Sequence, residues 1–303
     1  MKIIITGATG LIGKSLCKKL TDRNDDVVVF TRNADNAKKV LPFIKKFVEW
    51  DYAVLGGWEK KINGADCVIH LAGANLFEKR WNKSYKKTIL ESRKFSTKCL
   101  VNAIMNTEKK PSTFICASAA GYYGDRANEI LVEENNAGSD FLAKVCKAWE
   151  EEAKQIENTR VRRVSIRTGI VLSSEEGALK QMLPPFEKYL GGPLGNGRQW
   201  FPWIHIDDLV NIFICVIDNN YIFGAVNASS PNPVRMNEFA KTLGKVLHKP
   251  SLFKVPEFVL RLVVGEGAKS ILASLRVIPQ KLIQNKFNFQ YENLRPALED
   301  LLI

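Results

Sequence analysis

Three glycines near the amino terminus have the spacing of a phosphate-binding turn. The segment Gly7-Ala8-Thr9-Gly10-Leu11-Ile12-Gly13 follows the apolar stretch 3–6 and leads into an amphipathic helical pattern. In such a turn the first glycine allows a tight bend, the second lets backbone amides approach a diphosphate, and the third lets helix and strand pack closely. We therefore predict that this segment binds a dinucleotide, the alternative being a glycine-rich loop used only for turning.

The end of the second apolar stretch indicates which dinucleotide is preferred. An NAD-selective site usually places an acid there to bind the ribose 2′-hydroxyl, but residues 30–33 read Phe-Thr-Arg-Asn. Arg32 offers a guanidinium to a 2′-phosphate instead, which favours NADP(H) as the cofactor. A solvated arginine at a strand end is the alternative interpretation.

The charge balance points to an anionic ligand. The 303 residues include 44 Lys+Arg against 32 Asp+Glu, a net charge of +12. The basic residues are spread along the chain and alternate with acids, as they do on solvated helix faces. We expect an anionic small-molecule substrate and neither nucleic acid nor membrane as a partner. Nucleic-acid binding, with affinity that falls steeply with salt, is the weaker alternative.

Cysteine and histidine usage argues against metal sites. The six cysteines are scattered without a C-x-x-C pair, and none of the three histidines is spaced to complete a metal site. We expect no metal, no disulfide framework, and mostly buried cysteines. No window of about 18 apolar residues predicts a membrane span, and the start lacks a signal-peptide pattern, so we expect a cytoplasmic protein.

The elements that must position these residues are parallel strands alternating with helices. Short apolar runs rich in Ile and Val are typical of strands covered on both faces. They occupy residues 3–6, 27–31, 67–71, 113–117 and 161–167. Helical patterns cover residues 11–20, 85–106 and 140–158. The alternation predicts an α/β fold with a Rossmann-type, doubly wound parallel sheet.

Proline and glycine change the character of the chain beyond about residue 170. Pro184-Pro185, Gly191-Gly192-Pro193 and later prolines predict loops. Helical patterns return at residues 207–218, 237–247, 256–264 and 294–301. We predict a Rossmann domain over 1–170, with 205–230 returning to it. A loop-rich substrate region follows over 171–303 and includes a small carboxy-terminal domain at 250–303.

Several further segments resemble the extended short-chain dehydrogenase/reductases. Besides the glycine turn, these are Trp50-Asp51, His70-Leu71-Ala72-Gly73 and the block from Ser118 to Asp125. The resemblance implies that Asp51 contacts adenine and that Leu71, Ala72 and Gly73 line the cofactor. It also implies that Ser118 belongs to the active site.

A narrower resemblance covers nearly the whole chain. Arg80-Trp81, Ser92-Arg93 and the segments 141–150, 167–172 and 195–208 are similar to the YfcH-type epimerase family, and the tail is similar to its small carboxy-terminal domain of unknown function. This family implies a Rossmann fold and an NADP-type cofactor. Its substrate is poorly defined, so the resemblance leaves the reaction open.

The usual catalytic group of these enzymes is a Ser or Thr with a Y-x-x-x-K pair, in which the lysine favours phenolate formation. By resemblance, that window falls at Ala143-Lys-Val-Cys-Lys147. The tyrosine is therefore missing, and Lys147 either holds the nicotinamide ribose or is solvated. Tyr122, Tyr123 and His205 are the candidates to carry the proton in its place. The alternatives are that one tyrosine packs while the other shapes the cofactor pocket, and that His205 packs at a strand-to-helix junction with Asp207 as the helix cap.

Substrate-binding candidates gather in the segment 195–208. Arg198, Gln199, Trp200 and Trp203 combine stacking surfaces with polar contacts that suit a ring-bearing anion, although both indoles could instead belong to the core. Asn75 and Arg80 are further candidates from the loop after the third predicted strand.

Two functions remain open from the sequence. The first is an NADP(H)-dependent oxidoreductase or epimerase acting on a small polar substrate, sugar-like or nucleotide-linked. The second is a catalytically impaired NADP-binding regulatory module, an alternative that the missing tyrosine keeps open. The sequence does not indicate an oligomeric state.

Overall fold

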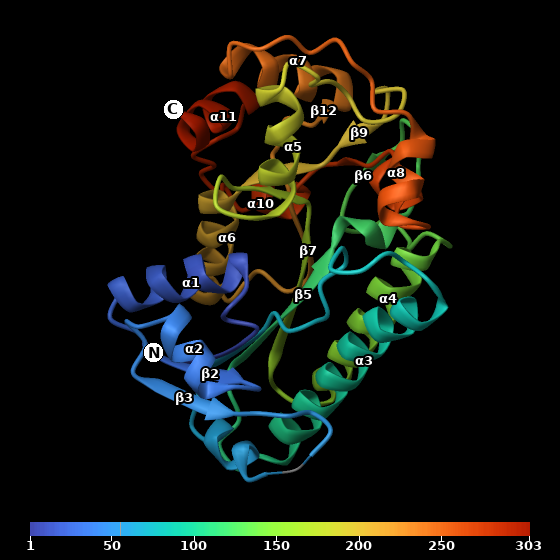
Figure 1. Cartoon of the computed structure of the whole chain (residues 1–303). Coiled ribbons are helices and arrows are strands. Elements are labelled where there is room, and N and C mark those ends of the chain that lie inside the picture. The colour runs from blue at the N-terminus through green and yellow to red at the C-terminus, as the bar shows by residue number, and fades with distance from the viewer. Residues whose placement is uncertain (55) are drawn as a thin grey trace.

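Seven parallel strands form the central sheet of the computed structural model, which describes residues 1–54 and 56–303 (Figure 1). Their order is β11-β7-β5-β4-β1-β2-β3. The strands are β1 (Lys2–Thr6), β2 (Asp26–Thr31), β3 (Lys46–Glu49), β4 (Cys67–His70), β5 (Thr113–Ala119), β7 (Arg162–Thr168) and β11 (Gly224–Ala228). The chain progresses in opposite directions from β1 and from β4, so the sheet is doubly wound and the predicted Rossmann-type fold is confirmed.

Helices cover both faces of the sheet, as the continuously apolar strands require. On one face lie α1 (Leu11–Asp22) and α6 (Ile206–Asp218), and on the other α3 (Lys83–Asn106) and α4 (Phe141–Lys154) (Figure 1). Along β1, Ile3 and Ile5 pack toward α1 and α6, whereas Ile4 packs toward α3 and α4. This alternation is the period of two expected of a strand buried on both sides.

Four shorter elements lie between the strands and the long helices along the chain. They are α2 (Ala34–Val40) and the 3-10 helices η1 (Trp58–Ile62), η2 (Ala120–Tyr123) and η3 (Gln155–Asn158). Of these, η2 matters most for the site, because it begins directly where β5 ends.

A second layer of elements stands above the carboxyl ends of the strands (Figure 1). Its helices α5 (Gly177–Glu187), α7 (Met236–Val246) and α11 (Leu294–Leu302) enclose a separate apolar core that includes Phe201, Trp203 and Phe239. The remaining elements are β6 (Ile130–Leu131), β8 (Ile170–Leu172), β9 (Trp200–Phe201), β10 (Trp203–His205), β12 (Val234–Arg235), β13 (Arg276–Val277), α8 (Glu257–Val264), α9 (Ala268–Ile271) and α10 (Gln280–Gln284). β9 and β12 pair antiparallel, and β13 pairs parallel with β6.

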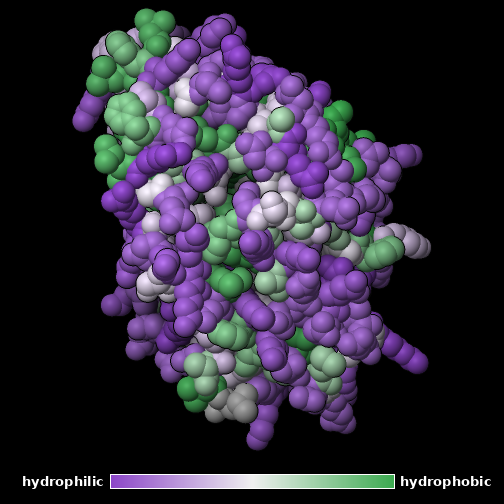
Figure 2. Space-filling model, turned by 90° about the vertical axis from the view of Figure 1, so that its right-hand side faces the viewer, coloured by the Kyte–Doolittle hydropathy of each residue, from purple (hydrophilic) through white to green (hydrophobic). Residues whose placement is uncertain are grey.

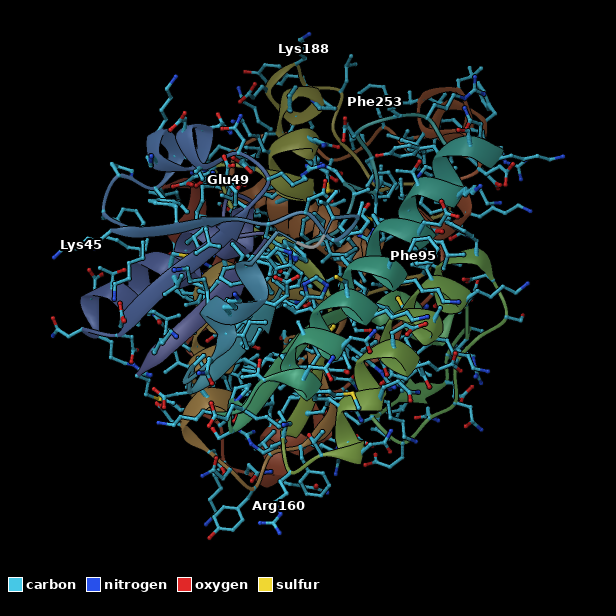
Figure 3. The ribbon with its side chains drawn as sticks, turned by 90° about the horizontal axis from the view of Figure 1, so that it is seen from below. Lys45, Glu49, Phe95, Arg160, Lys188 and Phe253 are labelled. Carbon is cyan, nitrogen blue, oxygen red and sulfur yellow. The ribbon has the colours of Figure 1, made fainter. Side chains whose placement is uncertain are left out.

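The loop predicted at Pro184 and Pro185 is not found, and α5 continues through both prolines. Proline removes one amide donor and usually breaks a helix interior. Here both prolines lie near the end of α5, and their own carbonyls accept hydrogen bonds from the amides of Lys188 and Leu190, at 3.2 and 2.8 Å. Figure 3 shows Lys188 and Phe253 at the same edge of the molecule, where the Phe253 amide bonds the Gly191 carbonyl at 3.1 Å.

Hydrophilic residues cover most of the face shown in Figure 2, with smaller hydrophobic areas between them. Large exposed apolar side chains occur on α8, where Phe258, Leu262 and Val263 are 64%, 67% and 69% exposed. Among the described residues, every helix is too short or too polar to span a lipid bilayer.

Candidate functional site

The turn between β1 and α1 has the shape of a diphosphate cradle. Gly7 has a φ of +71°, and a Cβ there would lie 2.7 Å from the Ala72 amide nitrogen on the neighbouring strand end. A Cβ on Gly13 would lie 2.5 Å from the Gly7 carbonyl oxygen. A Cβ on Gly10, by contrast, would have the Gly7 carbonyl oxygen as its nearest neighbour, at 3.6 Å. Gly10 is exposed, so its backbone is open to a ligand.

Helix α1 begins at this open position without a side-chain cap. The first amides of a helix have no partners within it, and the helix dipole favours an anion there. Thr9, Leu11 and Ile12 are partly exposed around these amides. The residues present therefore fit the diphosphate of a dinucleotide.

The ends of β2 and β3 carry the two residues predicted to select and hold the adenosine half. In the register of the sheet Phe30 pairs with Thr6, so Arg32 follows β2 at the level of the glycine turn. Arg32 and Asp51 are both exposed. The Asp51 carboxylate accepts a hydrogen bond from the Ala53 amide at 2.8 Å, whereas Arg32 forms no ion pair within the described ranges.

The segment after β4 lies directly against the glycine turn. The Leu71 amide donates to the Thr6 carbonyl at 3.1 Å, and the Ala72 amide donates to the Thr6 hydroxyl at 3.3 Å. Leu71 and Ala72 are partly exposed and Gly73 is exposed, so all three can line a ligand above the strand ends. Thr6 also bonds Nδ1 of the buried His70 at 2.7 Å.

Arg93, which the sequence analysis gave only as part of the family resemblance and not as a site residue, lies behind this segment. Its guanidinium lies over the Trp149 ring at 5.0 Å and donates to the Ala74 carbonyl at 3.0 Å. A Cβ on Gly73 would come within 3.0 Å of the Arg93 side chain. The contact explains why a residue without a side chain occupies position 73.

Ser118 belongs to a buried polar network at the end of β5. Its hydroxyl donates to the Glu150 carboxylate at 2.6 Å, and Glu150 in turn receives two hydrogen bonds from Arg167, at 2.8 and 2.9 Å. Only 4% of Ser118 is exposed. Its donor is thus used inside the protein, and the geometry gives it no direct path to a substrate oxygen.

The face of α4 that meets β5 carries neither a phenol nor an ammonium. Leu142 packs on Gly121, the Cys146 thiol faces Ser118, and Glu150 follows one turn later. Burial raises the pKa of Cys146 to about 12, which keeps the thiol neutral. The residues with the i, i+4 spacing that face the end of β5 are therefore Leu142 and Cys146.

This placement corrects the sequence-based window, which was one residue too late. Lys147 lies on the outer surface of α4, with 61% of its side chain exposed and its ammonium 3.9 Å from Glu151. A residue on that side of the helix cannot hold a nicotinamide ribose above the sheet. Ala143 is fully buried in the helix packing.

The two neighbouring tyrosines have different surroundings. Tyr123 is fully buried; its hydroxyl donates to Asn227 at 2.6 Å and accepts from Arg167 at 3.0 Å, and burial raises its pKa to about 12. It is a packing residue, not a proton carrier. Tyr122 is partly exposed, and the Arg167 guanidinium lies 3.5 Å from the centre of its ring.

His205 has a structural role, and it is the histidine itself, not Asp207 as the alternative interpretation had it, that caps the helix. It is 1% exposed, its Nδ1 accepts the Asp207 amide at 3.1 Å at the start of α6, and its Nε2 lies 3.3 Å from the Asp300 carboxylate. Burial lowers the pKa of His205. The side chain therefore caps α6 and ties it to α11, and its burial corrects its assignment as a proton carrier for a bound substrate.

The predicted substrate residues do not form one group. Trp203 is fully buried in the core, and Gln199 is 7% exposed with its amide bonded to the Leu194 carbonyl at 2.9 Å, so both are corrected to structural residues. Trp200 is partly exposed and Arg198 is exposed. Two residues that the sequence pattern did not indicate, Arg235 and Arg276, lie over the Trp200 ring.

Asn75 and Arg80 lie in the loop between β4 and α3. Asn75 is exposed, and its carboxamide oxygen accepts the Phe77 amide at 2.9 Å. Arg80 lines a surface cavity of about 540 Å³ together with Trp81 and Arg261. This cavity lies between the loop before α3 and helices α8 and α9, separate from the glycine turn.

Comparison with known families supports the interpretation of the glycine turn as a dinucleotide-binding site. The model of the NAD dependent epimerase/dehydratase family matches residues 3–228, and a domain of unknown function matches residues 255–301. The chain is 38% identical over 304 residues to the chloroplastic Epimerase family protein SDR39U1 homolog of Arabidopsis thaliana, covering 100% of this chain and 87% of the relative.

Two solved structures are similar over the whole chain. Human epimerase family protein SDR39U1, crystallised with NADPH, has a TM-score of 0.90 at 29% identity, with 99% of each chain covered. A nucleoside-diphosphate sugar epimerase from Corynebacterium glutamicum has a TM-score of 0.79 at 33% identity, covering 100% of this chain and 58% of the other.

Proposed function

Because this chain belongs to the NAD dependent epimerase/dehydratase family, we propose that it is an NADP(H)-dependent oxidoreductase or epimerase acting on a small, polar, anionic or sugar-like substrate. The observation that carries the proposal is the β1–α1 turn, where Gly10 leaves the first amides of α1 open to a diphosphate. The human relative crystallised with NADPH supports the choice of cofactor.

The residues that would hold the cofactor are divided among four strand ends, those of β1, β2, β3 and β4. The glycine turn takes the diphosphate, Arg32 the 2′-phosphate, and Leu71 to Gly73 the face of the nicotinamide half, while Asp51 contacts adenine. When bound, NADP(H) supplies a hydride donor or acceptor at C4 of its nicotinamide.

The chain must still move a proton, and Tyr122 is the group that we assign to this step. Of the five predicted catalytic residues, Ser118, Tyr123 and His205 are buried in internal contacts and Lys147 faces away. Tyr122 combines partial exposure with a place in η2, immediately beyond β5. Packing of its ring on Arg167 fixes its orientation.

A second function is favoured by one specific observation. The inner face of α4 presents Leu142 and Cys146 to the end of β5, and neither side chain can exchange a proton at neutral pH as a phenol–ammonium pair does. This face is what we expect of a regulatory module, which would bind NADPH and change the shape of its upper layer without turning over a substrate.

Steady-state turnover of NADPH with a panel of carbonyl compounds and nucleotide sugars separates the two functions. In the enzyme, Tyr122→Phe is expected to lower kcat by about 100-fold or more while the NADPH affinity stays unchanged. The matched control is Tyr221→Phe, because Tyr221 is 87% exposed. An absence of turnover and of isotope exchange across the panel, together with normal NADPH binding, would favour the regulatory module.

A further inference from the structure

Arg93 is a partly buried cation without a carboxylate partner. Its side chain leaves α3 and lies over the Trp149 ring of α4, with the guanidinium carbon 5.0 Å from the ring centre. In the part of the chain that the structure describes, no carboxylate oxygen lies within 4.0 Å of its nitrogens, and Glu152 of α4 faces Lys94 instead, at 3.9 Å. Burial lowers the pKa of Arg93, since no acid offsets the loss of water. Charges inside proteins are normally paired, so this guanidinium indicates a function.

The Arg93 guanidinium also has unused hydrogen-bond donors. Nη1 donates to the carbonyls of Ala74 and Ile89, at 3.0 and 3.1 Å. Nε and Nη2 have no partner among residues 1–54 and 56–303, and neither is enclosed as a buried polar atom is. These two nitrogens lie on one edge of the planar guanidinium, which matches a pair of oxygen atoms. This edge is therefore free to bind two oxygens of a ligand.

Gly73 keeps this edge uncovered. A Cβ at position 73 would lie 3.0 Å from the guanidinium carbon of Arg93 and 3.3 Å from its Nε. Gly73 is exposed and follows β4, at the carboxyl edge of the sheet, where open α/β folds bind ligands. The missing side chain thus presents Arg93 to the ligand-binding side of the sheet.

Arg93 also lies beside the place where a Y-x-x-x-K helix would carry its lysine. Helices α3 and α4 pack side by side (Figure 1). Burial raises the pKa of Cys146 to about 12 and Glu150 acts in the same direction, whereas the charge of Arg93 lowers it. The guanidinium is therefore close to the thiol at the second position of the i, i+4 pair that faces β5. The cation that this face of α4 lacks is present next to it, on α3.

The order of the strands places Arg93 on the side of the nicotinamide half of a dinucleotide. β4 lies between β1 and β5, whereas β2 and β3 lie on the opposite side of β1. Arg32 and Asp51 would hold the adenosine half beyond β2 and β3, and the glycine turn after β1 would hold the diphosphate. The other half must then extend over the end of β4 toward β5, past Gly73.

We propose that Arg93 binds the ribose of the nicotinamide half of NADP(H), with Nε and Nη2 donating to its two hydroxyls, and so replaces the lysine of the Y-x-x-x-K pair. Two neighbouring hydroxyls offer an oxygen pair that fits a guanidinium fork, whereas an ammonium acts as a single point charge. The proposal rests on the cofactor placement given under the proposed function. A substrate carboxylate is the other ligand that would fit this edge.

Isothermal titration calorimetry with three ligands, in the absence of any substrate, tests the proposal. The ligands are NADPH, 2′-phospho-ADP-ribose, which lacks the nicotinamide ring, and 2′,5′-ADP, which also lacks the second ribose. Arg93→Gln should weaken binding of the first two by about 10-fold or more and change binding of 2′,5′-ADP by less than about twofold. Lys98→Gln is the matched control, since it removes a charge from an exposed position of the same helix.

The outcomes separate this role from a structural one. Binding of 2′,5′-ADP by Arg93→Gln shows that the variant is folded. Arg93→Lys keeps the stem and the charge without the fork, so it should bind NADPH with intermediate affinity even if the glutamine variant does not fold. Wild-type affinity of Arg93→Lys for NADPH would overturn the proposal.

The pattern across the ligands of Arg93→Gln gives the remaining outcomes. A loss confined to NADPH would assign Arg93 to the nicotinamide ring, equal losses for all three ligands would assign it to the fold, and unchanged affinities would leave it to the substrate. Each of these results overturns the proposal while the proposed function stands. If the wild type binds neither NADPH nor 2′,5′-ADP, the proposed function fails and this inference fails with it.

Discussion

The carboxylate of Glu150 and the guanidinium of Arg167 form a two-pronged ion pair beneath the end of β5, with N–O distances of 2.8 and 2.9 Å. Only 13% and 4% of the two side chains are exposed. The pair joins helix α4 to strand β7 and receives the Ser118 hydroxyl. It therefore determines which face of α4 is turned toward the sheet.

Removing one partner of this pair should be costly, because the other charge stays buried. We expect Glu150→Gln to lower the free energy of unfolding by about 3 kcal/mol. Urea unfolding measures the change. Glu151→Gln is the control, since Glu151 is exposed beside Lys147 and should change stability by less than about 0.5 kcal/mol. Equal effects of the two substitutions would show that the pair does not stabilise the fold.

Two glycines of the same turn should respond differently to added side chains. A Cβ on Gly13 would meet backbone atoms at 2.5 to 2.7 Å, so Gly13→Ala is expected to destabilise the fold by about 2 kcal/mol. Gly10→Val should leave the melting temperature nearly unchanged but abolish NADPH binding. Thermal unfolding and NADPH titration distinguish the two, and normal NADPH affinity in Gly10→Val would disprove the cradle.

Arg32→Ala tests the preference for the phosphorylated dinucleotide. Loss of a charge-assisted contact to the 2′-phosphate should weaken NADPH binding by about 10- to 100-fold and leave NADH binding unchanged. Fluorescence titration with both dinucleotides measures the ratio. If the ratio is the same in Arg32→Ala and wild type, another residue reads the 2′-phosphate.

The buried His70 should make the protein sensitive to acid. Burial lowers the pKa of His70 from 6.5 to about 3, so the unfolded chain binds a proton more readily than the folded one. The stability associated with neutral His70 is therefore complete above pH 6.5 and is lost as the pH falls toward 3. At pH 5 this loss amounts to about 2 kcal/mol.

Denaturant unfolding of His70→Asn and wild type between pH 7.5 and 4.5 isolates that contribution. The wild type should lose more stability than the variant over this range. His248→Asn should follow the wild type, because His248 is exposed. A His70→Asn curve parallel to that of the wild type would mean that His70 does not govern the acid response.

The repeated pattern of apolar strands was sufficient to predict the sheet, because strands buried on both faces must be continuously apolar. Predicting the catalytic face of α4 required more than spacing. The position of the Y-x-x-x-K window was counted from Ser118 across the loop before Asp140, and the length of a loop follows no period. An error of one residue in that count assigns the window to a face of α4 about a quarter of a turn away. Contacts of Leu142 with Gly121 and of Glu150 with Ser118 set the true register.

Other residues were beyond the reach of a local pattern. Arg235 and Arg276 approach Trp200 only because separate strand pairs bring them there, and neither lies near Trp200 in the sequence. Aromatic and polar composition alone could not distinguish Trp203, which is buried, from Trp200, which is not. The continuation of α5 through Pro184 and Pro185 likewise depends on its position at the end of a helix.

The position of β11 affects how the protein can be made in the cell. This strand completes the edge of the sheet beside β7, but α5, β9, β10 and α6 lie between β7 and β11 along the chain. During synthesis on the ribosome, the outer edge of β7 therefore stays unpaired until β11 emerges. Unpaired strand edges promote aggregation. Cutting the gene after the first seven-tenths of the coding sequence would leave that edge permanently open, so expression trials should retain it through β11.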